Sequence, residues 1–348
     1  MENKRHIPDF FLLDDNSPII WERRKAEIKE LFQNEIYGHF PEKLTPSIKT
    51  EEREINFASK ARWESVYFTF ENDKGTHTVK TDLILPRGKT SIPVFLSIGF
   101  SADVPNKYLP IEEIIDNGFG VFHFCYENVT KDNNDFSDGL ASLFEGDFGK
   151  ITLWAYMASQ CMDYLCTRDE VDTTRVAIIG HSRLGKTALV ASAFDERFFL
   201  TCSNDSGCLG ASVSRGKVAE NETIEAITDV FPFWFSKKFL KYRDNVNSLP
   251  LDQHMLLALI APRHLIIGTA KDDLWADNEG QLLSCTLASR AWELYGKAGL
   301  INDMCEPCAP FELTKGTVSF YEREGSHFQS RTDWIAYMKK FKEILNEA

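Results

Sequence analysis

A serine framed by glycines, between a predicted strand and a predicted helix, constrains the fold of this chain more than any other feature. Residues 176–179 (VAII) are typical of a strand buried on both faces, and residues 184–194, rich in Ala and Leu, predict a helix. Ser182 lies between them, with Gly180 before it and Gly185 after it. A sharp strand-to-helix turn that exposes a reactive serine needs such glycines, because a Cβ there would collide with the neighbouring strand and helix. The helix N-terminus would favour a developing oxyanion.

The glycine spacing in this turn also fits a plainer structure. In the usual motif the second glycine comes two residues after the serine, whereas here Leu184 holds that position and Gly185 follows it. An ordinary strand–turn–helix connection, with Ser182 capping the helix, would have the same local sequence. The turn alone therefore leaves both interpretations open, and the rest of the chain has to decide between them.

The predicted elements on either side of this turn indicate an α/β fold. A hairpin is predicted at 63–85, with its turn at 72–75, and strands that alternate with helices follow it. Those strands are expected at 93–99, 118–126, 176–179, 199–204, 264–269 and 317–322, and the helices at 151–165, 184–194, 252–259, 282–295 and 333–345. This order predicts a mostly parallel central sheet with helices on both faces. We expect a single domain, 1–348, in which residues 1–60, with a helix at 21–37, form an N-terminal cover.

The composition excludes several classes of partner. The 39 basic and 52 acidic residues give a formal net charge of −13 without a run of Lys or Arg, which argues against nucleic acid or an anionic membrane as partner. No apolar segment approaches the length of a membrane span. The N-terminus lacks an apolar signal segment, so the sequence as written predicts a cytoplasmic protein, or a secreted one if a signal has been removed. The eight cysteines are expected to be mostly core residues, and the lone Cys305–Cys308 pair makes a poor zinc site.

Polar residues follow the predicted strands in the chain order of a hydrolytic triad. Ligands bind beyond the carboxyl ends of the strands in such a sheet, and Ser182 follows one of these strands. The acids Asp272, Asp273 and Asp277 follow a later strand, and His327 follows the last one. Serine, then acid, then histidine is the order of the α/β-hydrolase fold, in which the histidine is the general base and the acid holds its tautomer.

The identity of the triad acid stays open at this point. Asp205, at the end of the strand after the serine turn, competes with Asp273. Asp273 is favoured because the acid in this fold usually follows the strand directly before the one that leads to the histidine. Asp272 is expected to point away, since neighbouring side chains of an extended segment alternate. The plainer alternative is that the aspartates form a solvated loop.

Six sequence blocks together resemble one known family. The blocks are GHSRLGKTAL at 180–189, SNDSGCLG at 203–210, LPLDQHML at 249–256, IAPR at 260–263, DLWAD at 273–277 and GSH at 325–327. In this order they look like the glucuronoyl esterases, carbohydrate esterase family fifteen. The matching region extends from Trp21 to Trp334, nearly the whole chain, and few hydrolases place an arginine directly after the nucleophile.

The resemblance implies hydrolysis of esters of the glucuronate carboxyl group in a saccharide, as in glucuronoxylan joined to lignin alcohols. It implies that the Arg183 guanidinium acts in an oxyanion hole beside a backbone N–H, where a charged donor is stronger than a neutral one. No metal or organic cofactor is implied. The implied site residues are the catalytic Ser182, His327, Asp273 and Arg183, with Asp205 as the alternative acid, and the substrate-binding Lys186, Glu222 and Trp275, with Glu220 as a rival of Glu222.

Some positions depart from the family pattern, and two other functions stay open. Fungal relatives carry Glu at the position of Asp205, bacterial relatives can use the aspartate two residues before the tryptophan, and Phe328 stands where an aspartate often follows the histidine. Another carbohydrate esterase, such as an acetyl xylan esterase, would share the triad. A non-catalytic carbohydrate-binding relative would share the fold. The aromatic segment 231–235 either lines a pocket or fills the core.

Overall fold

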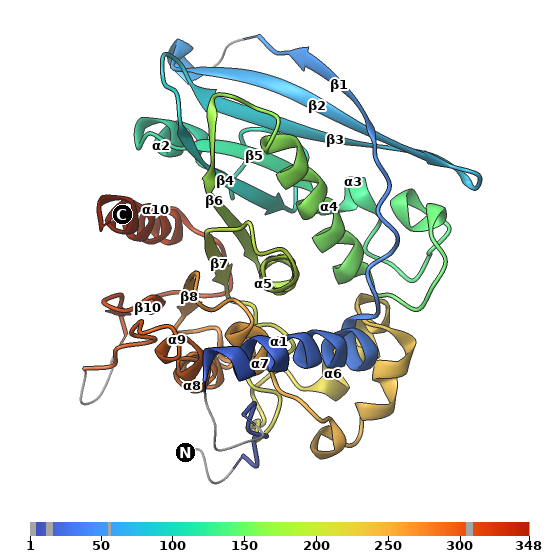
Figure 1. The fold of residues 1–348 in the computed structure, drawn as a ribbon, viewed down its shortest axis with the longest axis vertical. Coiled ribbons are helices and arrows are strands. Elements are labelled where there is room, and N and C mark those ends of the chain that lie inside the picture. The colour runs from blue at the N-terminus through green and yellow to red at the C-terminus, as the bar shows by residue number, and fades with distance from the viewer. Residues whose placement is uncertain (1–4, 12–16, 55–56, 304–308, 348) are drawn as a thin grey trace.

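The computed structural model describes residues 5–11, 17–54, 57–303 and 309–347. Its centre is a ten-stranded sheet (Figure 1). The strands are β1 (Ser47–Glu52), β2 (Ala61–Asn72), β3 (Gly75–Pro86), β4 (Ile92–Gly99), β5 (Gly120–Cys125), β6 (Val171–His181), β7 (Leu200–Asn204), β8 (His264–Ala270), β9 (Phe311–Leu313) and β10 (Val318–Arg323). They lie in the order β1-β2-β3-β5-β4-β6-β7-β8-β10-β9, and the six from β5 to β10 in that order run parallel. This mostly parallel sheet confirms the predicted fold class.

Helices cover both faces of the sheet, as predicted (Figure 1). They are α1 (Pro18–Phe32), α2 (Ile111–Asp116), α3 (Tyr126–Val129), α4 (Lys150–Leu165), α5 (Arg183–Phe194), α6 (Ile224–Val230), α7 (Gln253–Ala258), α8 (Asn278–Ala288), α9 (Arg290–Glu293) and α10 (Arg331–Glu347). Helices α4 and α5 lie on one face and α2 and α10 on the other. None of the helices in the described residues combines the length and apolar character that a bilayer crossing needs.

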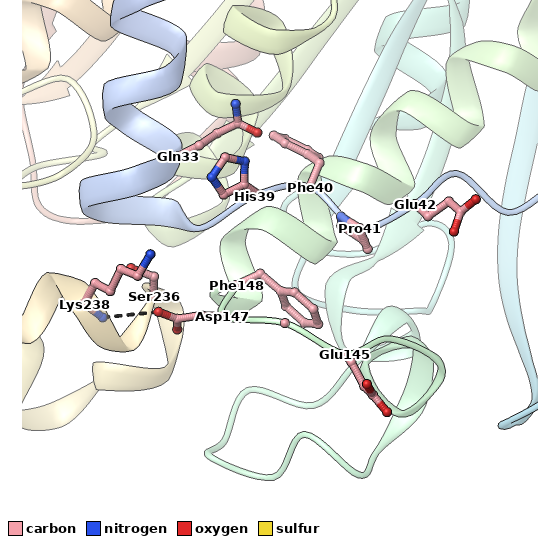
Figure 2. A pocket seen from close by; sticks show the side chains of 11 residues that line it. Gln33, His39, Phe40, Pro41, Glu42, Glu145, Asp147, Phe148, Ser236 and Lys238 are labelled. Carbon is pink, nitrogen blue, oxygen red and sulfur yellow. Dashed lines mark hydrogen bonds between the residues drawn. The ribbon is translucent and has the colours of Figure 1, made fainter.

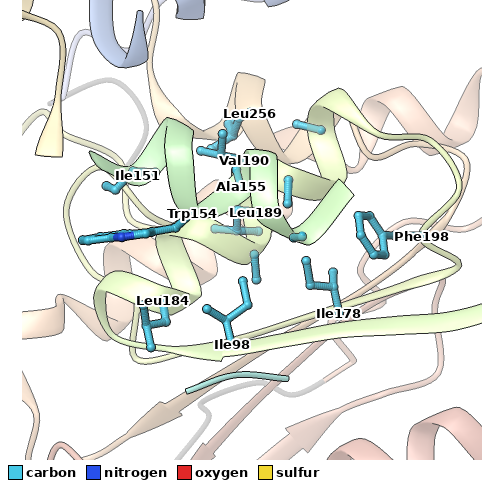
Figure 3. Close-up of a cluster of buried hydrophobic side chains, with 14 of the residues drawn as sticks. Ile98, Ile151, Trp154, Ala155, Ile178, Leu184, Leu189, Val190, Phe198 and Leu256 are labelled. Atoms are coloured by element: carbon cyan, nitrogen blue, oxygen red, sulfur yellow. The ribbon is translucent and has the colours of Figure 1, made fainter. Parts of the chain in front are cut away.

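The strand before the serine turn is buried on both faces, as its apolar run predicts. Ile178 of β6 packs in one cluster with Leu189 of α5 and Trp154 of α4 (Figure 3). Its neighbours Ala177 and Ile179 belong to the opposite cluster, with residues of α2 and α10. Because side chains of a strand alternate between faces, this pattern requires both helical layers. The turn at Ser182 therefore follows a strand that is packed between helices on both faces of the sheet.

The N-terminal segment contains a helix where its apolar spacing predicts one. Helix α1 begins after Ser17, whose side chain accepts a hydrogen bond from the Ile20 N–H, and it buries one side through Trp21, Ile28 and Phe32. A π-helical turn, η2 (Gln33–Tyr37), extends it. The same segment also supplies the edge strand β1, which the polar sequence 47–52 did not predict. The organisation of 1–348 as a single domain stays a prediction.

Several elements were missed because each is only a few residues long. Strand β9 has three residues and helix α2 has six. The predicted helix 282–295 is divided into α8 and α9 at Ser289, whose hydroxyl bonds the Cys285 carbonyl. Segment 211–250 contains α6 and the short turns η5 (Pro232–Trp234), η6 (Lys237–Tyr242) and η7 (Val246–Ser248).

The cysteines of the described residues are all free, and five of these six are buried, as expected for core residues. The Cys305–Cys308 pair lies outside the described residues.

Candidate active site

Ser182 occupies a strained turn between β6 and α5. Its backbone has φ 58° and ψ −126°, a region that non-glycine residues rarely adopt. A Cβ on Gly180 would lie 2.1 Å from the Leu184 carbonyl oxygen, and one on Gly185 would lie 3.0 Å from Ser203 of β7. The late glycine is thus explained, because it is needed where α5 packs against β7. The Ser182 side chain makes no capping bond, which contradicts the plainer interpretation of this serine as a helix cap.

Two backbone hydrogen bonds bring the loop after β8 beside the loop after β10. The N–H of Lys271 bonds the Arg323 carbonyl at 2.8 Å, and the N–H of Asp272 bonds the Gly325 carbonyl at 3.0 Å. Asp273 then comes to lie next to His327, with its Oδ2 2.6 Å from the histidine Nδ1. The predicted contact between Asp273 and His327 is confirmed.

The burial of these residues fits an acid that orients a base. The Asp273 side chain is 5% exposed, and the His327 side chain is 44% exposed. A shielded carboxylate interacts more strongly with the imidazole, while the outer ring nitrogen stays accessible. Asp272 is exposed, so the prediction that it points away is also confirmed.

Asp205 is a neighbour of this pair but has a different environment. Its Oδ1 accepts a bond from the Ala270 N–H at 2.9 Å, and its buried Oδ2 has no hydrogen-bond partner. Burial first, and then the negative charge of Asp273, raise the pKa of the Asp205 carboxyl well above its ordinary value. Ligand-type atoms of Asp205, Asp273 and His327 lie within 4.8 Å of one another. Asp273 contacts the His327 Nδ1 directly, whereas the bonded oxygen of Asp205 is used by the Ala270 N–H, so the geometry favours Asp273.

Arg323, which sequence reasoning missed, anchors the loop that carries His327. Its Nε donates to both carboxylate oxygens of Asp333 at 2.9 and 3.0 Å. Its Nη2 donates to the carbonyls of Ser326 and Phe328, on either side of the histidine. An arginine at the end of a strand gives no signal of this role in the sequence, since the role depends on where the following loop folds back.

His181, directly before the serine, packs against His327. The two ring centroids are 4.4 Å apart, and the His181 Nδ1 lies 2.7 Å from Asn204 Oδ1. Burial, reinforced by His327, lowers the pKa of His181 to about 3. This ring therefore stays neutral at neutral pH and adds no positive charge beside His327.

The guanidinium of Arg183 is held by an acid and two aromatic rings. Its Nη1 forms an ion pair with Asp132 Oδ2. Its central carbon lies 4.7 Å from the ring of Trp234 and 5.1 Å from that of Phe231, and these two rings stack on each other. Segment 231–235 therefore supports a predicted site residue, while Phe235 fills the core. Asp132 was missed because the polar loop around it has no readable pattern.

The predicted sugar-binding residues converge around the loop 206–209. The Lys186 ammonium donates to the carbonyls of Ser206 and Cys208 at 2.7 and 2.6 Å and to Glu222 Oε2 at 3.0 Å. The Glu222 N–H bonds the Trp275 carbonyl at 2.9 Å. All three ammonium hydrogens of Lys186 are thus used, so a sugar hydroxyl would have to replace one of these partners.

The two candidate glutamates and the tryptophan differ in exposure. Glu222 is buried against Lys186, whereas Glu220 is exposed, which favours Glu222 over its rival. Trp275 lies on the short turn η8 (Leu274–Ala276), and half of it, 51%, is exposed. An exposed indole held at a fixed position is suited to stacking against a sugar ring.

Two cavities lie outside the predicted triad. The one in Figure 2 has a volume of about 350 Å³ and is lined between His39, Phe148 and Lys238. A second, of about 430 Å³, is lined in part by Asn134 and by Pro232, Phe233 and Phe235, so the aromatic segment 231–235 lines a pocket as well as packing into the core. Neither is lined by a predicted triad residue.

Comparisons with known proteins agree with this geometry. A family profile described as "Glucuronyl esterase, fungi" matches residues 68–296. A curated relative, carbohydrate esterase MZ0003 from an unknown prokaryotic organism, is 32% identical over 97% of this chain and 89% of its own length. A glucuronoyl esterase structure from Solibacter usitatus superposes with a TM-score of 0.87 at 30% identity, covering 97% of each chain.

One further solved structure contains a ligand. It is a mutant glucuronoyl esterase from Sporotrichum thermophile in complex with methyl 4-O-methyl-β-D-glucopyranuronate. It superposes with a TM-score of 0.71 at 21% identity, covering 97% of this chain and 88% of that one. At this identity the likeness supports the fold.

Proposed function

The chain belongs to the glucuronoyl esterase family, carbohydrate esterase family 15, whose members are carboxylic ester hydrolases, and on this premise we propose that it hydrolyses esters of glucuronic acid through an acyl-enzyme on Ser182. The observation that carries the proposal is the 2.6 Å contact between His327 Nδ1 and Asp273. It joins the ends of two strands in the chain order of a triad, and His327 packs against His181, the residue before the serine on the strained turn. The substrate class is that of the relatives, esters of 4-O-methyl-glucuronate.

In the proposed mechanism the His327 Nε2 takes the proton of the Ser182 hydroxyl as its oxygen attacks the ester carbonyl carbon. Asp273 accepts the Nδ1–H, which fixes the tautomer and stabilises the imidazolium. The tetrahedral intermediate then expels the alcohol, which receives that proton from His327. Water, activated by the same histidine, attacks the acyl-enzyme, and expulsion of the Ser182 oxygen releases glucuronate.

The remaining residues have separate proposed roles. Arg183 supplies charged donors to the oxyanion, next to a backbone N–H. The carboxylate of Glu222 accepts from ring hydroxyls, and Trp275 stacks on the ring. Lys186 holds Glu222 and the loop 206–209 in place and exchanges one partner for a sugar hydroxyl when substrate binds.

The test is hydrolysis of two ester classes by the same preparation. We expect turnover of the methyl ester of 4-O-methyl-glucuronate, in which the sugar supplies the acyl half of the ester. We expect little turnover of acetylated xylose, in which the sugar supplies the alcohol half. Preference for acetylated xylose would assign the chain to an acetyl esterase instead. Absence of turnover on both, with an intact fold, would indicate a carbohydrate-binding relative.

A further inference from the structure

Asp132 is a shielded carboxylate with three polar partners. Its side chain is 7% exposed. Its Oδ1 accepts a bond from the Trp234 indole N–H at 2.6 Å, and its Oδ2 accepts one from the Tyr126 hydroxyl at 3.3 Å and pairs with the Arg183 Nη1. Burial, followed by the charge of Asp132, raises the pKa of the Tyr126 phenol, which therefore keeps the proton that it donates.

The loop that carries Asp132 is fixed by its own hydrogen bonds. Its N-terminal end is held where the Lys131 N–H bonds Asp138 Oδ2 at 2.7 Å. The buried ammonium of Lys150 donates to the Thr130 hydroxyl at 2.6 Å and to the Asp135 carbonyl at 2.7 Å. Since these bonds lie on both sides of position 132, the carboxylate is held in a defined place on a segment without regular structure.

Only one of the guanidinium nitrogens of Arg183 has a hydrogen-bond acceptor in the described residues. Within the described residues, its only hydrogen-bond acceptor is Asp132, and that bond uses Nη1. Its Nε is buried and has no partner. The guanidinium carbon also lies within 5.1 Å of both ring centroids of the Trp234–Phe231 stack, so the group is held by ring contacts as well as by charge.

We propose that Asp132 is a positioning residue for Arg183 and holds the guanidinium by Nη1 so that the Nη2 donors, which are not buried, stay available to the oxyanion. The proposal rests on the assigned function of Arg183. A partly buried arginine with one partner would otherwise have several rotamers, and the entropy lost on binding the oxyanion would reduce its contribution. The Asp132 carboxylate and the Trp234 ring remove that freedom before substrate arrives.

The direct test is Asp132→Asn. Asparagine has the same shape but a single acceptor oxygen, so it cannot accept from Trp234 and Arg183 through separate oxygens. We expect kcat for the methyl ester of 4-O-methyl-glucuronate to fall about 10- to 100-fold while KM changes little, because misplacement of an oxyanion donor acts on the transition state. The matched control is Asp135→Asn on the same loop, an exposed acid whose side chain bonds only Ser137 in the described residues. This control should keep the wild-type kcat.

A double-mutant cycle separates positioning from a structural role. If Asp132 acts through Arg183, then Asp132→Asn should cost almost nothing further in kcat when Arg183 is already alanine. Losses that multiply would overturn the proposal, as would a wild-type kcat in Asp132→Asn. A wild-type kcat in Arg183→Ala would instead remove the oxyanion role itself.

If Asp132→Asn does not fold, Trp234→Phe takes its place. It keeps an aromatic face against Arg183 and removes the donor to Asp132 Oδ1. We expect a smaller fall in kcat, again with KM nearly unchanged and again absent in the Arg183→Ala background. A change confined to KM would overturn the proposal.

Discussion

The two sides of the site are built in different ways. On the triad side, Ser182, Asp273 and His327 follow the ends of β6, β8 and β10, and a backbone ladder aligns the last two loops. On the loop side, Asp132 and Glu222 lie on irregular segments that reach Arg183 and Lys186 through ion pairs. The first side is positioned by the sheet, and the second by side chains.

This difference predicts different effects of mutation on the two sides of the site. Changes on the triad side remove a reacting group whose position the fold already guarantees, so activity should be lost without loss of structure. Changes on the loop side disturb placement, because each anchor is a side chain with only a few partners. We therefore expect large effects on kcat from the first side, and smaller effects, divided between kcat and KM, from the second.

The largest expected effect is that of Ser182→Ala. Activity should fall by at least about 10³-fold, while the unfolding midpoint stays near or above that of the wild type, because the change removes no packed group. Kinetics with a glucuronate ester and thermal unfolding of the same sample check both statements. Activity close to the wild type would place the nucleophile elsewhere.

The two acids of the triad side give the next contrast. Asp273→Asn should lower kcat by about 10²- to 10³-fold or more, since the amide no longer stabilises the imidazolium. Asp205→Asn should cost less, because Asp205 bonds the Ala270 N–H and Asp273 is the acid that contacts His327 Nδ1. The double mutant should lose more than either, since the second carboxyl can partly replace the first. Comparison of the three kcat values checks this order, and a larger loss in Asp205→Asn would reverse the assignment.

Arg183→Lys tests the loop side of the site, where we expect kcat to change while KM stays nearly the same. Lysine lacks the planar fork that lies against Trp234, so kcat should fall about 10²- to 10³-fold with KM little changed. A pure KM effect would mean that Arg183 binds ground-state substrate.

Glu222→Gln should have a smaller effect, mainly on KM. The amide keeps the size of the carboxylate but weakens its bonds to Lys186 and to sugar hydroxyls, and about a tenfold rise in KM is expected. The exposed neighbour provides the control, since Glu220→Gln should leave KM unchanged. Equal effects of the two substitutions would contradict the subsite.

The pH dependence of stability should report His181 on the triad side. Its pKa is about 3 in the folded protein and near 6.5 when unfolded, so the unfolded state binds more protons between these values. Stability should therefore be lost as pH falls below 6.5. In His181→Gln, stability should fall less steeply with decreasing pH, as measured by denaturant titrations at several pH values. Part of the pH dependence should remain, because burial also lowers the pKa values of His254 and His264 to about 4. An unchanged slope would contradict the neutral state of His181.

The same division governs what the sequence could predict. The strand ends were predictable because short apolar runs and their glycines are local signals, and so the Ser182, Asp273 and His327 positions followed from chain order. The position of the late glycine is explained only by the fold, through the contact of Gly185 with β7. The resemblance to a family added Arg183, Lys186, Glu222 and Trp275, which no periodic pattern indicates.

The missed residues have long-range causes. Asp132 is 51 positions from Arg183 in the sequence, and its loop has neither apolar periodicity nor a turn signature. Arg323 acts on a loop through backbone carbonyls, which every residue possesses. Such contacts depend on how separate loops meet above the sheet, and this meeting is determined only by the complete fold.

The most direct test of the central claim, that Ser182 is the nucleophile of a glucuronate esterase, is covalent labelling with a fluorophosphonate followed by peptide mass spectrometry. One adduct is expected, on the peptide that contains Ser182, and the methyl ester of 4-O-methyl-glucuronate should slow its formation. The label should be absent in Ser182→Ala and much slower in Asp273→Asn. A label on another serine, or a labelling rate that the glucuronate ester does not change, would contradict the claim.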